Sequence, residues 1–171
     1  MSYVLCWSVR PGKIQIAEAT AQDVPVILDF IRQLAEYERL ADKVTATEDQ
    51  LRLTLFGPRP AAEILLAAVD GETVGYALFF TTYSTFLAKP GLYLEDLFVK
   101  SQARGKGIGT ALLARLAQVA VERNCGRVEW TVLNWNEPSI GFYNSLGAVP
   151  MSDWTLFRLT GESLSNLAKK S

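Results

Sequence analysis

Histidine is absent from this chain of 171 residues, and cysteine is scarce. Without an imidazole there is no Ser-His-Asp triad and no His-rich zinc site, so acid-base chemistry falls to carboxylates, Tyr, Lys or Cys. The two cysteines, Cys6 and Cys125, are too few for a disulfide framework or a zinc-ligand set. We therefore expect a reducing, cytoplasmic environment and no bound metal.

An excess of one charge sign and long apolar runs are also lacking. Seventeen Lys and Arg residues face 18 Asp and Glu residues, which leaves no basic excess to release counterions from nucleic acid. No apolar run approaches the roughly 18 residues that a membrane-spanning helix needs. Met1 to Lys13 has no long apolar stretch behind a basic lead, as a signal peptide would. Neither nucleic acid nor a membrane is an expected partner.

The composition that remains is that of an ordinary globular protein. Hydrophobic residues make up 49% of the chain and charged residues 20%, which leaves no disordered tract to set aside. A chain of this length can bury one substantial core. We expect an N-terminal extension over residues 1–13 and a single domain over residues 14–171.

Hydrophobic periodicity alternates between strand and helix patterns along the chain. Asp70-Gly71 joins two apolar runs as a tight hairpin turn does, and Gly57-Pro58 ends a helix. The pattern predicts a mixed α/β protein without internal repeats. Strands are expected near residues 14–19, 63–69, 73–82, 93–99, 127–133 and 154–159, and helices near 24–40, 47–56, 105–123 and 137–146, with a short helix at the C-terminus.

A glycine-rich turn, Gln102-Ala-Arg-Gly105-Lys-Gly107-Ile-Gly109-Thr110, lies between a predicted strand and a long amphipathic helix. Unobstructed backbone amides and the helix dipole at such a place can surround a phosphate. The spacing matches neither a Walker A loop nor the Gly-x-Gly-x-x-Gly dinucleotide fingerprint. A tight turn that allows close packing of the helix on the sheet is the alternative explanation.

Three motifs in order resemble the GNAT acetyltransferases. Gln102-Ala-Arg-Gly105-Lys-Gly107 matches the family's pyrophosphate-binding motif, the strand Tyr93-Leu-Glu-Asp-Leu-Phe-Val99 precedes it, and Leu133-Asn-Trp-Asn-Glu-Pro-Ser-Ile-Gly-Phe-Tyr143 follows. With Leu34-Ala-Glu-Tyr-Glu-Arg-Leu40, they resemble the spermidine/spermine (diamine) and thialysine branch. The resemblance covers roughly Ile14 to Leu167. It implies acetyl-CoA as donor, a homodimer, and a mixed sheet of about six to seven strands with a splayed fourth and fifth pair, flanked by about four to five helices.

The resemblance also implies roles for particular residues. An ammonium ion cannot attack a thioester until it loses a proton, and Glu95 holds the family's position for a base that works through water. Tyr143 holds the position of the general acid that protonates the departing thiolate. A backbone amide near Val99 is the implied oxyanion donor. A solvent-facing strand carboxylate and a half-buried helix tyrosine are the alternative interpretations of these two side chains.

Coenzyme A and acceptor contacts follow from the same resemblance. A cationic acceptor suits carboxylates beside aromatic rings, with Asp96 binding the cation or holding the shape of the site. Glu38 could equally lie on the solvated face of a helix end, and Trp154 could simply fill the core. The expected coenzyme A contacts are Leu97, Phe98, Val99, Gln102, Arg104, Gly105, Lys106, Gly107, Ile108, Gly109, Thr110, Asn136, Ser139 and Tyr143, and the expected acceptor contacts are Tyr37, Glu38, Glu95, Asp96 and Trp154.

The predicted function is therefore direct transfer of an acetyl group from acetyl-CoA to a primary amine of a diamine, polyamine, ornithine or thialysine. Because the transfer is expected in a ternary complex, Cys125 is not assigned as a nucleophile. A non-catalytic module that binds coenzyme A is an alternative, since a fold does not guarantee turnover. Acetylation of protein or peptide amines is another, and it would need an open groove.

Overall fold

The structure is a computed structural model that describes residues 12–170. Cys6 and almost all of the expected N-terminal extension therefore lie outside the described residues. Two compact units make up the chain, Met1–Thr131 and Val132–Ser171. The single domain expected over residues 14–171 stays a prediction, and each unit is described by itself.

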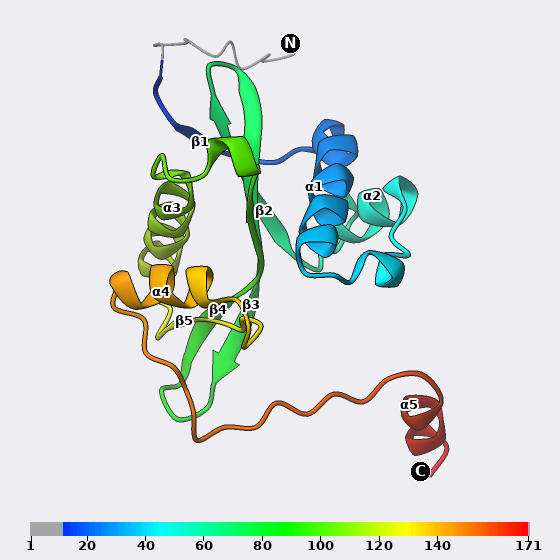
Figure 1. The fold of residues 1–171 in the computed structure, drawn as a ribbon. Coiled ribbons are helices and arrows are strands. Elements are labelled where there is room, and N and C mark those ends of the chain that lie inside the picture. The colour runs from blue at the N-terminus through cyan, green and yellow to red at the C-terminus, as the bar shows by residue number, and fades with distance from the viewer. Residues whose placement is uncertain (1–11, 171) are drawn as a thin grey trace. The chain divides into compact units, whose positions relative to one another are not determined.

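The first unit is built on a five-stranded sheet with the strand order β1-β2-β3-β4-β5. Its strands are β1 (Gln15–Glu18), β2 (Glu63–Val69), β3 (Glu72–Ser84), β4 (Lys89–Val99) and β5 (Val128–Trp130). Neighbouring strands are antiparallel except for β4 and β5, which are parallel. Helices α1 (Val24–Tyr37) and α2 (Glu48–Phe56) cover one face, and α3 (Ile108–Glu122) covers the other (Figure 1).

Local sequence signals explain where several of these elements begin and end. Thr47 caps α2, because its hydroxyl accepts the Gln50 N–H while the Gln50 side chain accepts the Thr47 N–H. Asp70 and Gly71 both have positive φ, 52° and 82°, as the tight turn between β2 and β3 requires. Short 3-10 turns at Ala21–Asp23, Ala41–Lys43 and Ser101–Ala103 connect the longer elements.

Two layers of apolar side chains hold the first unit together. On one face, the Phe30 ring of α1 stacks on Tyr76 of β3 at 5.6 Å and contacts Phe98 of β4 at 5.7 Å. On the other face, Leu112 and Leu116 of α3 are fully buried. Each such side chain contributes about 1.5–3 kcal/mol when it is removed from water. The core therefore lies on both faces of the sheet.

The second unit contains α4 (Glu137–Ser145) and α5 (Gly161–Ala168). Gly147 follows α4 with φ at 84°, the left-handed conformation that closes many helices. The strand predicted over residues 154–159 is wrong, since the described segment between α4 and α5 forms neither helix nor strand. The Trp154 N–H bonds locally to the Met151 carbonyl, whereas a strand requires a neighbouring strand for its backbone groups.

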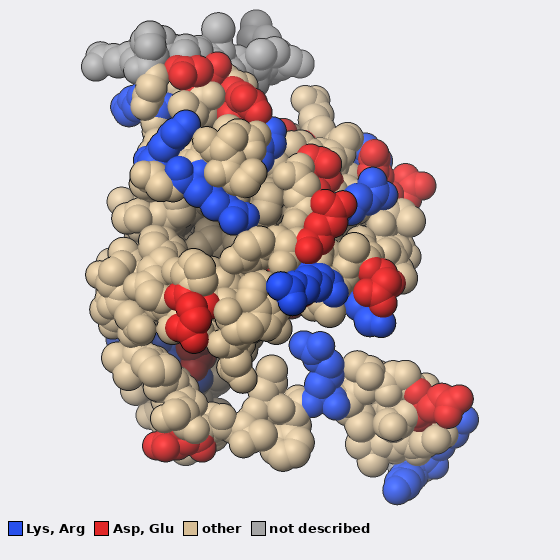
Figure 2. All heavy atoms as spheres, viewed as in Figure 1, with Lys and Arg blue, Asp and Glu red and all other residues tan. Residues whose placement is uncertain are grey.

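The expected mixed α/β architecture is present, although the described residues form five strands where the resemblance implied about six to seven. The last expected strand is missing, and β5 is shorter than the expected 127–133. Within residues 12–170, no helix combines the length and the apolarity needed to cross a bilayer. Acidic and basic side chains are interspersed on the face that Figure 2 shows, in keeping with nearly balanced charges.

Candidate functional site

The parallel pairing of β4 with β5 ends partway along β4, because β5 ends at Trp130. The two strands pair only from Leu92 to Leu94 of β4, so β5 supplies no partner to the rest of that strand. Lys100 donates its N–H to Val74 of β3, and the neighbouring Val99 carbonyl instead accepts from the Arg104 side chain. Because backbone groups alternate in direction along a strand, the N–H groups of Leu97 and Val99 point toward the opening. The expected splayed pair is present.

A β-bulge at Glu95 lies where the pairing of β4 with β5 ends. Leu78 of β3 is opposite Asp96, and the next residue, Phe79, is opposite Leu94, so Glu95 is the extra residue of β4. The bulge interrupts the regular alternation of side chains along β4 at Glu95. As a result, Leu94 lies on the same face of the sheet as Phe79, and Asp96 lies on the same face as Leu78. Leu78 packs against the core beneath α1.

Carboxylates from two elements converge beside this bulge. Burial chiefly raises the pKa of Asp96, the Glu95 charge raises it further, and a hydrogen bond from Tyr76 at 2.8 Å opposes this rise. Burial, with the Asp96 charge, also raises the pKa of Glu38, the C-cap residue that follows α1. Like charges held together in a partly buried place favour the arrival of a cation. The predicted acceptor residues Glu38, Glu95 and Asp96 are thus brought together.

The glycine-rich turn ahead of α3 has an open backbone. Gly105 and Gly107 have φ of 73° and 80°, and Gly107 is the N-cap of α3. No atom lies within 4 Å of a Cβ built at either glycine, so the backbone there is open. The first N–H groups of α3, from Ile108 to Thr110, have no acceptors within the helix. This turn can surround a phosphate with backbone donors.

Arg104 connects this turn to the end of α1. Its Nε donates to the Val99 carbonyl at 2.9 Å, and its guanidinium lies 4.8 Å from the centre of the Tyr37 ring and 5.8 Å from that of Phe98. Such cation-π contacts are worth about 0.5–2 kcal/mol. A residue predicted to contact coenzyme A therefore also holds the predicted acceptor residue Tyr37. Gln102 and Lys106 are exposed on the same turn.

The remaining predicted residues belong to the second unit. Asn136 caps α4, because its side-chain oxygen accepts the Ser139 N–H at 3.4 Å. Ser139 and Tyr143 are four residues apart and share one face of the helix. The Tyr143 ring lies 5.4 Å from that of Phe142. Trp154 is 74% exposed in the segment that follows α4.

Sequence reasoning missed Tyr76, whose hydroxyl reaches Asp96 from within the sheet. The strand pattern carries a signal for it, because a tyrosine in a run of buried apolar residues must find a partner for its hydroxyl. Sequence reasoning also did not predict the contacts of Lys100. Its ammonium pairs with Glu72 at 2.8 Å and lies 5.7 Å from the centre of the Phe30 ring.

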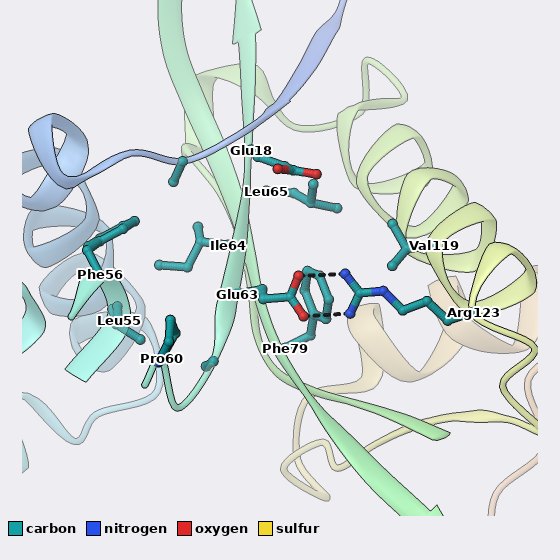
Figure 3. Close-up of a pocket in the computed structure, with 12 residues that line it drawn as sticks. Glu18, Leu55, Phe56, Pro60, Glu63, Ile64, Leu65, Phe79, Val119 and Arg123 are labelled. Carbon is teal, nitrogen blue, oxygen red and sulfur yellow. Dashed lines mark hydrogen bonds and ion pairs between the residues drawn. The ribbon is translucent and has the colours of Figure 1, made fainter. Parts of the chain in front are cut away.

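A separate pocket lies at the β1–β2 side of the sheet, between α2 and α3 (Figure 3). Glu63 and Arg123 form a bidentate ion pair at 2.5 Å and 2.6 Å across it. None of the predicted site residues lines this pocket. The candidate site is therefore the region beside Glu95, where the pairing of β4 with β5 ends. In the described part of the chain, no three His, Cys, Asp or Glu side chains lie close enough together to hold a metal ion, and this includes Glu38, Glu95 and Asp96.

Comparison with known proteins agrees with this geometry. Residues 29–148 match the profile of the Acetyltransferase (GNAT) family. The chain therefore belongs to the GNAT acetyltransferases, and the prediction of an acetyltransferase enzyme is confirmed.

Several named relatives share most of the chain. It is 39% identical over 168 residues to a thialysine N-epsilon-acetyltransferase of Bos taurus, covering 92% of this chain and 98% of the relative. It is 34% identical to an L-ornithine N5-acetyltransferase of Arabidopsis thaliana, over 91% of this chain and 88% of the relative. An integron cassette protein from the mobile metagenome of V. cholerae has a similar structure, with a TM-score of 0.78, 28% identity and coverage of 92% and 98%.

Proposed function

We propose that this protein transfers the acetyl group of acetyl-CoA to a primary amine of a small cationic acceptor, such as a diamine, polyamine, ornithine or thialysine. The carboxylates of Glu38, Glu95 and Asp96, gathered beside the opening between β4 and β5, are the observation that carries the proposal. They would attract a cation to the place where unpaired strand amides can hold a thioester. Relatives named for thialysine and ornithine acetylation support the same acceptor class.

The chain's residues fit acetyl-CoA, which would supply the activated acetyl group. The open backbone at Gly105 and Gly107 and the N-terminus of α3 would take the pyrophosphate, helped by Lys106. The N–H groups of Leu97 and Val99 would bond the pantetheine arm in place of a neighbouring strand. The remaining expected contacts are Phe98, Gln102, Arg104, Ile108, Gly109, Thr110, Asn136, Ser139 and Tyr143.

Two side chains would move protons in a direct transfer within a ternary complex. Glu95 is exposed at the bulge, where a water can join it to an ammonium group and carry away the proton. The freed amine would attack the thioester carbonyl, and an amide near Val99 would stabilise the oxyanion. As the carbon–sulfur bond breaks, Tyr143, which the family resemblance assigns as the general acid, would donate its proton to the departing thiolate and regain one from the acylated nitrogen through water.

The acceptor's second positive charge would lie against Asp96 and Glu38, with Tyr37 offering an aromatic face. The family resemblance alone assigns Trp154 to the same acceptor. Tyr37 is held by Arg104 at the end of α1, beside Glu38. We also propose, from the resemblance alone, that the enzyme works in the cytoplasm as a homodimer.

The test is a coenzyme A release assay with acetyl-CoA and spermidine, spermine, putrescine, ornithine, thialysine, lysine or a histone-tail peptide. Glu95→Gln and Tyr143→Phe should each lower kcat by about 10²- to 10⁴-fold, because each removes one proton transfer. Glu36→Gln and Tyr83→Phe are matched controls at exposed positions and should keep full activity. Tight binding of acetyl-CoA without turnover on any small amine would refute the proposed function.

A further inference from the structure

Tyr76 has the largest of the fully buried side chains in the described core, yet it carries a polar hydroxyl. Its ring stacks on Phe30 with an interplanar angle of 18°. A phenylalanine would fill this space in the same way, so packing does not account for the hydroxyl. Burying a hydroxyl costs free energy unless it is hydrogen-bonded.

The Tyr76 hydroxyl donates to Oδ2 of Asp96 at 2.8 Å. Tyr76 is opposite Phe98 and Asp96 is opposite Leu78, so the two residues are diagonal neighbours on one face of the sheet. Burial and the surrounding carboxylates raise the pKa of Tyr76 well above its usual value. The phenol therefore keeps its proton and acts as the donor.

Asp96 is a carboxylate that needs such a donor. Burial and the Glu95 charge favour its neutral form, whereas the bond from Tyr76 favours the ionised form. Two further carboxylates interact with Tyr76 and Asp96. Glu95 precedes Asp96 on β4, and Glu38 follows the end of α1. Without the phenol, the cluster would retain a proton to higher pH and would attract cations less strongly.

We propose that Tyr76 is a positioning residue of the acceptor site, whose buried hydroxyl keeps the Asp96 carboxylate ionised and turned toward a cationic amine. This inference rests on the proposed function, because it needs an acceptor that carries positive charge. Tyr76 itself touches no substrate and acts through Asp96. Its effect falls on acceptors with a second ammonium group, while the binding of acetyl-CoA does not depend on it.

The first test compares Tyr76→Phe with Tyr83→Phe, which removes a hydroxyl from an exposed ring near the end of the same strand. The KM of Tyr76→Phe for thialysine should rise about tenfold or more, the size expected for losing a hydrogen bond to a charged group. Its KM values for acetyl-CoA and for butylamine, which has one ammonium group, should stay within about twofold of wild type. Equal losses for both amines, or no loss at all, would overturn the inference.

A double-mutant cycle separates positioning from general damage. In the Asp96→Asn background, Tyr76→Phe should change the thialysine KM by less than about twofold, because the group through which it acts has gone. Independent, multiplying effects would contradict the proposed coupling.

A third measurement needs no turnover. The Asp96 carboxyl, followed by ¹³C NMR, should titrate at higher pH in Tyr76→Phe than in wild type, and an unchanged titration would overturn the inference. If wild type acetylates no small amine, the proposed function fails while this titration still decides whether Tyr76 controls Asp96.

Discussion

Replacing Gly107 by alanine tests the backbone geometry on which the glycine-rich turn depends. Gly107 is the N-cap of α3 and has φ at 80°, where an L-residue with a Cβ is strained by about 1–2 kcal/mol. No atom lies within 4 Å of that Cβ, so a steric clash adds nothing to the cost. The melting temperature should therefore fall by about 2–8 °C, given about 2–4 °C per kcal/mol for a chain of this size.

Differential scanning calorimetry of two further variants checks the cause. Gly107→Asn should cost less than Gly107→Ala, because asparagine tolerates the left-handed conformation better. Gly141→Ala, within α4 and with the same open space, should instead stabilise the protein by about 0.5–1 kcal/mol, since glycine weakens a helix interior. If Gly107→Ala is neutral, or if Gly107→Asn is equally costly, the strain argument is wrong.

Three further substitutions probe the core and the charged groups, each by urea unfolding. Leu112→Ala should cost about 2–5 kcal/mol because the side chain is fully buried, whereas Val121→Ala, 79% exposed on the same helix, should stay within about 0.5 kcal/mol. A hydrogen bond from Arg123 lowers the pKa of Glu63, so Arg123→Gln should destabilise the protein above pH 4.5, and the difference should vanish as the pH falls through the lowered pKa. A gap that persists in strong acid would contradict this. Burial raises the pKa of Asp96, so the ionised carboxylate destabilises the folded protein at neutral pH. Asp96→Asn should therefore increase stability at neutral pH and give no increase below pH 3.8, where Asp96 is protonated in both the folded and the unfolded state. The same substitution should weaken acceptor binding. Destabilisation at neutral pH would refute that assignment.

Elements that depend on near neighbours in sequence were predictable. The strand over residues 63–69 was predicted with its observed bounds, and Asp70-Gly71 forms the expected turn. The N-cap Thr47 and the glycine-rich turn ahead of α3 also follow local rules, because capping and positive φ involve residues only a few positions apart.

The same local reasoning failed where a backbone needs a distant partner. Residues 154–159 have apolar and β-prone side chains, but the described unit that contains them offers no strand to pair with. A strand is stabilised by hydrogen bonds to its neighbour, so propensity alone does not create one.

The amino-acid sequence by itself determined the family, the order of the elements from β1 to α4 and the residue types of the candidate site. Only the tertiary structure decided how those residues meet. The bulge at Glu95 arises from the register between β3 and β4, and the bond from Tyr76 to Asp96 joins residues 20 positions apart. Arg104 lies over Tyr37 because the turn and the end of α1 come together on one face of the sheet. Pairing register and packing set these contacts, and both depend on the whole sheet.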